Sequence, residues 1–286
     1  MWCVDQPVLN VGDTFDTCIS RISDTPRNGN LKTRLEGIRP SIVTLSTDYR
    51  RFANAGEMFR MPQQEDVDGS VTKKELVELY DGRMAKKNGP GRSLYTKIKL
   101  LPDHDRCPFC DHRDVSTLDH ILPKSLFPAL AVTPLNLVGS CKDCNKAKLT
   151  QSPTSTADAV LHPYFDDVSD KTWLRARVIE SDVCAVLFHA KERKAWGADK
   201  NARLKAQFKT LKLNRLYSSQ AAREMSGIRE SLLRKHDAGG AESVQHELYD
   251  QWQSRKADRR NCWQTALYRA LSKSEWYCDY GFRLGN

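Results

Sequence analysis

Residues Cys107 to Lys148 read CPFCDHRDVSTLDHILPKSLFPALAVTPLNLVGSCKDCNKAK, and this stretch decides the fold of the region around it. It contains two C-x-x-C pairs, Cys107 with Cys110 and Cys141 with Cys144, separated by thirty residues. Four thiolates in two such pairs suit one tetrahedral zinc ion, because each two-residue gap forms a knuckle that directs both sulfurs to the same point. We therefore expect a structural zinc that joins the two ends of the stretch.

The residues between and after the cysteine pairs predict a strand, a long loop, a second strand and a helix. Leu118 to Leu122 is a short apolar stretch that ends before a proline, which is typical of a strand. Leu135 to Ser140 predicts the second strand, and a helix is expected to open near Lys142. Asn145 then falls in the first turn of this helix, and Lys148, three residues later, shares its face.

This order of elements resembles the HNH nucleases. The segments DHILPKS, NLV and CKDCNKAK carry the likeness, in the order and at the spacings of that family, and they lie within 42 of the 286 residues. The family fold is a two-stranded ribbon and a helix around one catalytic metal ion. The resemblance implies an α+β protein with a central ββα-metal core and a structural zinc, flanked by mainly helical N- and C-terminal regions.

The resemblance also implies a role for each polar residue of the motif. Asp119 corresponds to a metal ligand, and His120 corresponds to the general base. Asn136 corresponds to the asparagine that braces the loop and the histidine, and Asn145 to the second metal ligand. Many relatives have histidine at this last position, where asparagine is another accepted form. Lys148 is added to the catalytic group as a point charge for a neighbouring phosphate.

The chemistry of phosphodiester hydrolysis supports these roles. A hard divalent cation, Mg²⁺ or Mn²⁺, with few protein ligands keeps positions open for phosphate and water, and the oxygens of Asp119 and Asn145 are hard ligands. His120 has an ordinary pKa of about 6.5, which leaves neutral imidazole to deprotonate water at pH 7. Neighbouring side chains of a strand point to opposite faces, so we expect a bend at the Asp119–His120 step that lets both groups converge. The candidates for contacts with nucleic acid are Lys124, Lys146 and Lys148.

Outside this core the chain predicts mostly helices. The parts we expect are an N-terminal helical region at 1–103, the nuclease core at 104–150, and strands followed by helices at 151–286. Leu31 to Ala55 has a helical apolar stripe, in which Pro40 should kink or split the helix. Thr72 starts a capping box whose helix should run to about Lys87. A further short helix is expected from Arg92 to Leu100.

The C-terminal part predicts a strand pair, Leu174 to Ile179 and Cys184 to His189, followed by helices, the last from about Ala241 to Leu271. His162, just beyond the core, is either a structural histidine or a group that approaches the metal. One basic cluster of the last helix is a candidate DNA-contacting face or a solvated surface. Its members are Arg255, Lys256, Arg259 and Arg260.

Composition agrees with a polyanionic partner. Lys and Arg number 45 against 36 Asp and Glu, which gives a net charge of +9, and a pI near 9.1 favours nucleic acid. The nine cysteines are an odd number, and together with the lack of a signal peptide they favour reduced thiols in the cytoplasm. No apolar run approaches the roughly 18 residues of a membrane span.

These observations predict a metal-dependent HNH endonuclease that hydrolyses DNA, most simply double-stranded DNA, as an anti-phage or restriction-type effector. The layout of the chain also resembles stand-alone bacterial HNH proteins, some of which act in phage defence beside an ATPase, as in Septu-type systems. Three alternatives stay open at this point. They are a zinc-ribbon module that binds nucleic acid without cutting, an RNase, and a nuclease that cuts only with its ATPase partner.

Overall fold

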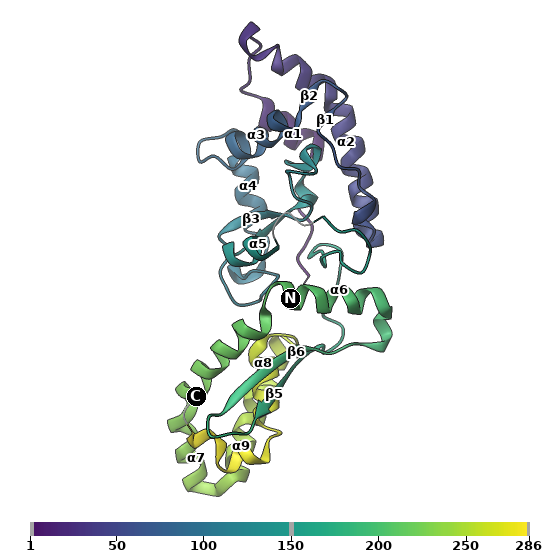
Figure 1. The fold of residues 1–286 in the computed structure, drawn as a ribbon. Helices are drawn as coiled ribbons and strands as arrows, with labels where there is room; N and C mark the ends of the chain where they lie inside the picture. Colours follow the sequence, from purple (N-terminus) through teal and green to yellow (C-terminus); the bar gives the residue numbers. More distant parts are fainter. Residues whose placement is uncertain (1–2, 149–151, 285–286) are drawn as a thin grey trace. The chain divides into compact units, whose positions relative to one another are not determined.

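The computed structural model describes residues 3–148 and 152–284, which divide into two compact units (Figure 1). We call Cys3–Asp167 the N-terminal unit and the part from Val168 onward the C-terminal unit. The described residues combine helices with two-stranded antiparallel sheets, β1–β2, β3–β4 and β5–β6. The predicted α+β class is therefore confirmed. No helix in this part of the chain is long and apolar enough to cross a membrane.

Two helices open the N-terminal unit, α1 at Val11–Ile19 and α2 at Leu31–Ala55. The predicted bounds of α2 are confirmed, and Gly56 ends it with a φ of 71°, a left-handed conformation that suits glycine. Of the two expected effects of Pro40, a kink or a split, the split does not occur, because α2 is continuous through Pro40. Pro40 and Glu36 are exposed, and the Glu36 carbonyl that loses its N–H partner can instead bind water.

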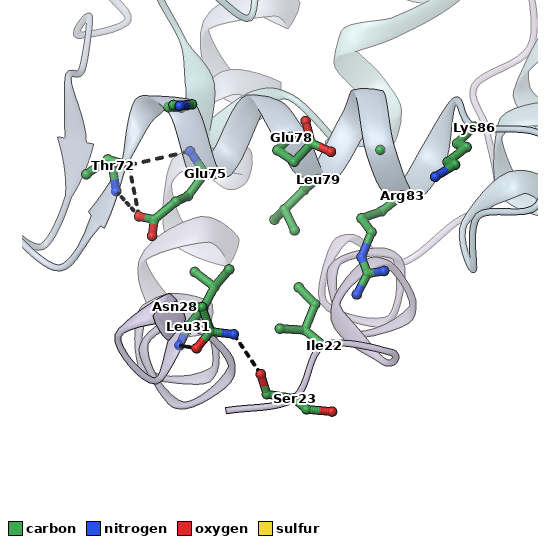
Figure 2. Close-up of a pocket in the computed structure, with 12 residues that line it drawn as sticks. Ile22, Ser23, Asn28, Leu31, Thr72, Glu75, Glu78, Leu79, Arg83 and Lys86 are labelled. Atoms are coloured by element: carbon green, nitrogen blue, oxygen red, sulfur yellow. Dashed lines mark hydrogen bonds between the residues drawn. The ribbon is translucent and has the colours of Figure 1, made fainter. Parts of the chain in front are cut away.

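A small hairpin of β1, Asp66–Val67, and β2, Val71–Thr72, leads into α3, Lys73–Glu78. The predicted capping box is confirmed: Thr72 Oγ1 accepts from the Glu75 N–H, and Glu75 Oε2 accepts from the Thr72 N–H at 2.9 Å (Figure 2). A π-helical stretch, η3 at Leu79–Met84, continues α3. The predicted short helix is α4, Arg92–Lys99. Short 3-10 turns of this unit are η1 Pro26–Asn28, η2 Met58–Arg60, η4 Asp103–Asp105, η5 Pro128–Leu130 and η6 Pro134–Asn136.

The predicted strand, loop, strand and helix are present in that order. Strand β3, Thr117–His120, pairs antiparallel with β4, Leu137–Ser140, and α5, Lys142–Lys148, follows. Leu118 of β3 and Leu137 of β4 enter the same apolar core as the first helices. The N-terminal helices thus pack against the apolar face of the ribbon, and this packing fixes where the polar side chains of the ribbon lie.

The C-terminal unit begins with a second ribbon, β5 at Leu174–Ile179 and β6 at Ala185–Ala190, close to the predicted bounds. Its helices are α6 Gly197–Thr210, α7 Leu213–Asp258, α8 Trp263–Leu271 and α9 Glu275–Asp279, with 3-10 turns η7 Lys194–Trp196 and η8 Gly281–Arg283. One face of the ribbon packs on α7 and α8 through residues such as Phe188, whose ring meets Tyr217 edge to face at 5.5 Å.

Helix α7 turns back on itself at Gly239 and Gly240, where Gly240 has a φ of 65°. Lys235 and Glu247 form an ion pair of 3.2 Å across the turn, whereas twelve residues of straight helix would span about 18 Å. The predicted single helix from Ala241 to Leu271 is wrong, because α7 ends at Asp258 and α8 starts at Trp263. The break has a tertiary cause, described next.

Asn261 lies in the segment between α7 and α8 and ties it to the second ribbon. Its Oδ1 accepts from the Trp173 N–H at 2.9 Å, and its Nδ2 donates to the Lys171 carbonyl at 2.9 Å. These groups precede strand β5 and would otherwise be buried without partners. Cys262 then caps the start of α8 by accepting from the Thr265 N–H.

Candidate active site and zinc cluster

The four predicted cysteines converge into one cluster. Their Sγ atoms all lie within 4.8 Å of one another, and all four residues are buried. Cys110 Sγ and Cys141 Sγ, one from each pair, are 4.0 Å apart. Bonds of about 2.3 Å to a tetrahedral zinc place sulfurs roughly 3.8 Å apart. The cluster therefore has the donor type, number and spacing of a structural zinc site.

The local backbone supports the cluster in the manner of zinc knuckles. The Arg113 N–H donates to Cys110 Sγ at 3.5 Å, and the Cys144 N–H donates to Cys141 Sγ at 3.4 Å. Hydrogen bonds from the other cysteine thiols, that of Cys107 first, lower the pKa of Cys110, which favours the thiolate that a metal needs. The site could thus hold zinc, and it would link the loop before β3 to the start of α5.

Asp119, the predicted metal ligand, lies on β3 with 5% of its surface exposed. Lys148 of α5 donates to its Oδ2 at 2.7 Å and also reaches the His120 carbonyl at 3.4 Å. Burial raises the pKa of the Asp119 carboxyl, and the ammonium of Lys148 offsets part of that effect. The carboxylate keeps a second oxygen, and one oxygen suffices for monodentate binding of a hard cation.

Lys148 is buried rather than exposed, with 7% of its surface accessible. Besides Asp119, its ammonium lies over the ring of Phe109, 5.1 Å from the centroid. Lys148 supplies the positive charge that compensates the buried Asp119 carboxylate.

His120, the predicted base, is fixed by two contacts. Its Nε2 lies 2.9 Å from the Ala131 carbonyl oxygen, and its ring packs edge to face on Tyr80, centroid to centroid 4.4 Å. A carbonyl can only accept, so Nε2 carries the proton and Nδ1 has the lone pair of the neutral ring. Burial lowers the pKa of His120 to about 4, so the imidazole is neutral at pH 7.

The predicted bend at the Asp119–His120 step is wrong. Both residues belong to β3 and pair regularly, Asp119 with Val138 and His120 with Leu137. The chain bends only afterwards, at residues 121 and 122. Cross-strand hydrogen bonding holds the strand extended through His120, because both flanks of the ribbon are anchored in the core.

Asn136 holds the loop between the strands closed. It has no exposed surface, its Oδ1 accepts from the Leu122 N–H at 2.8 Å, and its Nδ2 donates to the Leu122 carbonyl at 3.0 Å and the Leu130 carbonyl at 3.2 Å. These bonds fix the chain two residues after His120 and directly before Ala131, whose carbonyl holds the imidazole. Asn136 therefore orients His120 through the backbone.

Asn145 is in the first turn of α5, as predicted, and is half-buried. Its Nδ2 donates to the Leu118 carbonyl at 3.4 Å, so the amide nitrogen faces β3 and the amide oxygen remains available as a hard ligand. Its neighbour Lys146 is exposed and forms no ion pair with any described residue. Lys124, in contrast, pairs with Asp81.

Tyr80 and Ala131 were not identified from the sequence. Tyr80 sits in the π-helical stretch η3, forty residues before His120, and Lys124 lies over its ring at 4.9 Å. In the sequence Tyr80 appears only as one more apolar position of a helix. No local signal could have linked it to His120, since the contact arises from tertiary packing.

Two further features lie apart from these groups. His162 is buried: its Nδ1 accepts from the Tyr164 N–H at 3.2 Å, and its Nε2 is 3.1 Å from the Leu135 carbonyl. Both ring nitrogens are engaged within the protein, which supports the structural alternative. A hollow of about 780 Å³ is lined by residues including Ile22, Glu78 and Arg83 (Figure 2). None of the predicted catalytic residues is among the described residues that line it.

Comparisons with known proteins place these observations in context. The chain is 25% identical over 282 residues to protein ea31 of Escherichia phage lambda, covering 92% of this chain and 95% of that protein. It is 33% identical over 82 residues to the Septu protein PtuB of Bacillus thuringiensis, covering 27% of this chain and 31% of PtuB. No family model and no solved structure matches the chain. The four-cysteine cluster and the partial similarity to a Septu protein together fit a zinc-binding, HNH-like protein.

Proposed function

We propose that this protein is a metal-dependent endonuclease that hydrolyses DNA phosphodiester bonds. The observation that carries the proposal is the state of His120: a neutral imidazole whose Nε2 proton is bound by the Ala131 carbonyl, so that Nδ1 is the basic atom. It lies directly after Asp119, on a ribbon that a four-cysteine cluster closes.

In the proposed mechanism, Asp119 and Asn145 would hold Mg²⁺ or Mn²⁺ through one carboxylate and one amide oxygen. Because β3 is regular at the Asp119–His120 step, the proposal requires the phosphate and its attacking water to connect this metal with His120 Nδ1. The metal, when bound, supplies Lewis acidity to the scissile phosphate and its leaving oxygen. His120 Nδ1 takes a proton from water, and the resulting hydroxide attacks phosphorus. The P–O3′ bond breaks, which leaves a 5′-phosphate and, once the oxygen is protonated by solvent, a 3′-hydroxyl.

Two supporting roles complete the proposal. Lys148 neutralises the buried Asp119 carboxylate before substrate arrives and can turn to a phosphate once a cation is bound there. Lys124, Lys146 and Lys148 are the proposed contacts with nucleic acid, of which Lys146 is the exposed one without an ion pair among the described residues.

The decisive experiment is cleavage of supercoiled plasmid by the full-length protein with Mg²⁺ or Mn²⁺, beside His120→Ala and an EDTA control. His246→Ala is the matched control, because His246 is an exposed histidine of α7. We expect cutting by the wild type and by His246→Ala and none by His120→Ala, which should still fold. Equal cutting by His120→Ala would refute the assigned base.

A second candidate is a nuclease of phage defence that cuts only when joined by an ATPase partner in the cytoplasm. The partial similarity to the Septu protein PtuB favours it. This candidate predicts that the folded wild type binds DNA but leaves plasmid intact, and that cutting appears when the products of neighbouring genes are added. Absence of any complex after co-purification with those products would count against it.

A further inference from the structure

The two units of the chain differ in charge. Residues 168–286 contain 23 Lys and Arg against 14 Asp and Glu, whereas residues 1–167 contain 22 of each. The whole formal charge of +9 therefore belongs to the C-terminal unit. The four-cysteine cluster and the proposed catalytic residues all lie in the uncharged N-terminal unit. The unit without catalytic residues is thus the one with the electrostatic character of a nucleic-acid binder.

The basic cluster at residues 255–260, which the sequence suggests as a DNA-contacting face, makes contacts within the protein instead. The Arg255 guanidinium lies over the Tyr268 ring at 4.2 Å, binds the Gln251 side chain and approaches Glu224 at 3.7 Å. Arg260 donates to the Asp170 carbonyl at 2.6 Å. These cations serve internal contacts, so the excess charge must be sought on another surface.

The β5–β6 ribbon offers such a surface. Its inner face is buried against the helices through residues such as Leu174 and Phe188. On the outer face Arg175 is paired across the strands with His189, and Arg177 with Leu187. The Lys191 N–H donates to the Trp173 carbonyl at 2.8 Å, so the ladder continues one residue further and exposed Lys191 extends the row of His189. We call Arg175, Arg177, His189 and Lys191 the basic face.

No carboxylate neutralises this basic face within the described residues. Arg175, Arg177 and Lys191 form no ion pair there. Burial, and after it the positive charges of Arg177 and Lys191, lower the pKa of His189, so the charges that this ring senses are cations. Beside β5 a depression of about 550 Å³ is lined by Arg177, by Arg269 of α8 and by Lys273 just after that helix, together with Glu180 and Glu275.

We propose that the basic face binds the phosphate backbone of double-stranded nucleic acid. A two-stranded ribbon is narrow enough to lie in a duplex groove. Arg175 and Arg177, two residues apart, are separated by about 7 Å along the strand, which equals the rise of two nucleotides along a duplex axis at about 3.4 Å each. Contacts to phosphate are independent of base sequence, so this face would hold a duplex without selecting a site.

The proposal concerns a surface that shares no residue with the proposed catalytic site. Its basis is charge complementarity: three cations without an ion pair among the described residues lie on one two-stranded ribbon, in a unit that holds all of the net positive charge. Phosphates are common to DNA and RNA, so the basic face could bind a duplex of either kind. The binding measurements below distinguish the two.

The test is binding of a fluorescent 20-base-pair DNA duplex by the full-length protein in EDTA, where no metal-dependent cutting occurs. The variant is the triple Arg175→Ala, Arg177→Ala and Lys191→Ala. The matched control removes the same charge from exposed positions of α6 and α7 that form no ion pair among the described residues. It is the triple Lys209→Ala, Arg215→Ala and Arg223→Ala. Tryptophan emission and circular dichroism verify that each variant is folded.

We expect the first triple variant to bind at least about tenfold more weakly, with the slope of log K against log salt smaller by roughly 3, near 0.9 for each lost phosphate contact. The control triple should stay within about threefold of the wild type. Duplex RNA is titrated in parallel, and the specific loss with either duplex supports the proposal and identifies the polyanion. Failure of the wild type to bind either duplex, or equal losses in both triples, would overturn it.

This experiment separates the surface from the proposed activity. A wild type that binds through the basic face and never cuts plasmid refutes the nuclease and leaves the surface standing. A wild type that cuts, while the first triple variant binds and cuts like it, refutes the surface alone.

Discussion

Replacing Asn136 with alanine should lower the stability of the N-terminal unit more than the same replacement at Asn145, the other asparagine of the motif. The side chain has no exposed surface and makes three hydrogen bonds to the loop. Alanine removes all three. The Leu130 carbonyl keeps the Thr133 N–H as a donor, but the Leu122 N–H and carbonyl lose the side-chain partner that they have in the structure.

The expected magnitude follows from those two groups. A buried polar group left without a partner costs about 1–3 kcal/mol, so the pair at Leu122 gives a loss of about 3 kcal/mol. Asn145→Ala is the matched control, because Asn145 is half-buried and its side chain makes a single bond of 3.4 Å. That control should cost less than about 1 kcal/mol. If the proposed roles hold, both variants lose cleavage, and only Asn136→Ala loses stability.

The assay must follow the N-terminal unit by itself. Five of the six tryptophans, Trp173, Trp196, Trp252, Trp263 and Trp276, lie in the C-terminal unit, so tryptophan emission reports mainly on that unit and not on the loop. Hydrogen exchange followed by mass spectrometry, on peptides that cover residues 117–140 in increasing urea, does. Tryptophan emission then serves as an internal reference for the other unit. An Asn136→Ala protein whose loop is protected to within about 1 kcal/mol of the wild type would refute the bracing argument.

Three other changes test separate parts of the structure. Removing zinc with a chelator, or replacing Cys107 with serine, should unfold residues 107–148, because structural zinc contributes directly to folding. Hydrogen exchange of this segment should then become faster. An unaltered exchange pattern would exclude a structural metal. Lys148→Met should destabilise the unit by about 3 kcal/mol in urea, since Asp119 stays buried without its counter-charge, and the double variant with Asp119→Asn should recover part of this loss; additive losses would show that the pair is not coupled. The Arg34 guanidinium lowers the pKa of Glu75 from 4.5 to about 2. The contribution of the ionised Glu75 to the free energy of unfolding is therefore complete above pH 4.5 and is lost as the pH falls towards 2. We expect about 2 kcal/mol after allowance for partial exposure, and Glu75→Gln should lack this acid-sensitive part in urea titrations at pH 5 and pH 3.

Local patterns in the sequence predicted the elements well where short-range spacing decides them. The two cysteine pairs, the capping box of Thr72, and α2 ending before Gly56 all depend on residues within a few positions of one another. The strand, loop, strand and helix order around the motif follows from apolar stretches and turn residues in the same way. The catalytic roles assigned to Asp119, His120, Asn136 and Asn145 stay predictions that the cleavage assay must test.

Where long-range contacts decide, the sequence-based expectations failed. Asn261 breaks the last helix because it satisfies backbone groups nearly ninety residues earlier. Lys148, treated from the sequence as a point charge for phosphate, is buried against Asp119, twenty-nine residues away.

The sequence by itself determined the donor set of the zinc cluster, the order of the ribbon and helix, and the identity of the proposed base. Those properties depend only on the types of residues and on their short spacings along the chain. The tertiary structure was needed to show that the Ala131 carbonyl holds the His120 proton on Nε2 beside Tyr80, and that Arg175, Arg177 and Lys191, which form no ion pair among the described residues, lie on the β5–β6 ribbon. The physical reason is that desolvation and charge pairing depend on which distant segments pack together, and spacing along the chain does not specify that packing.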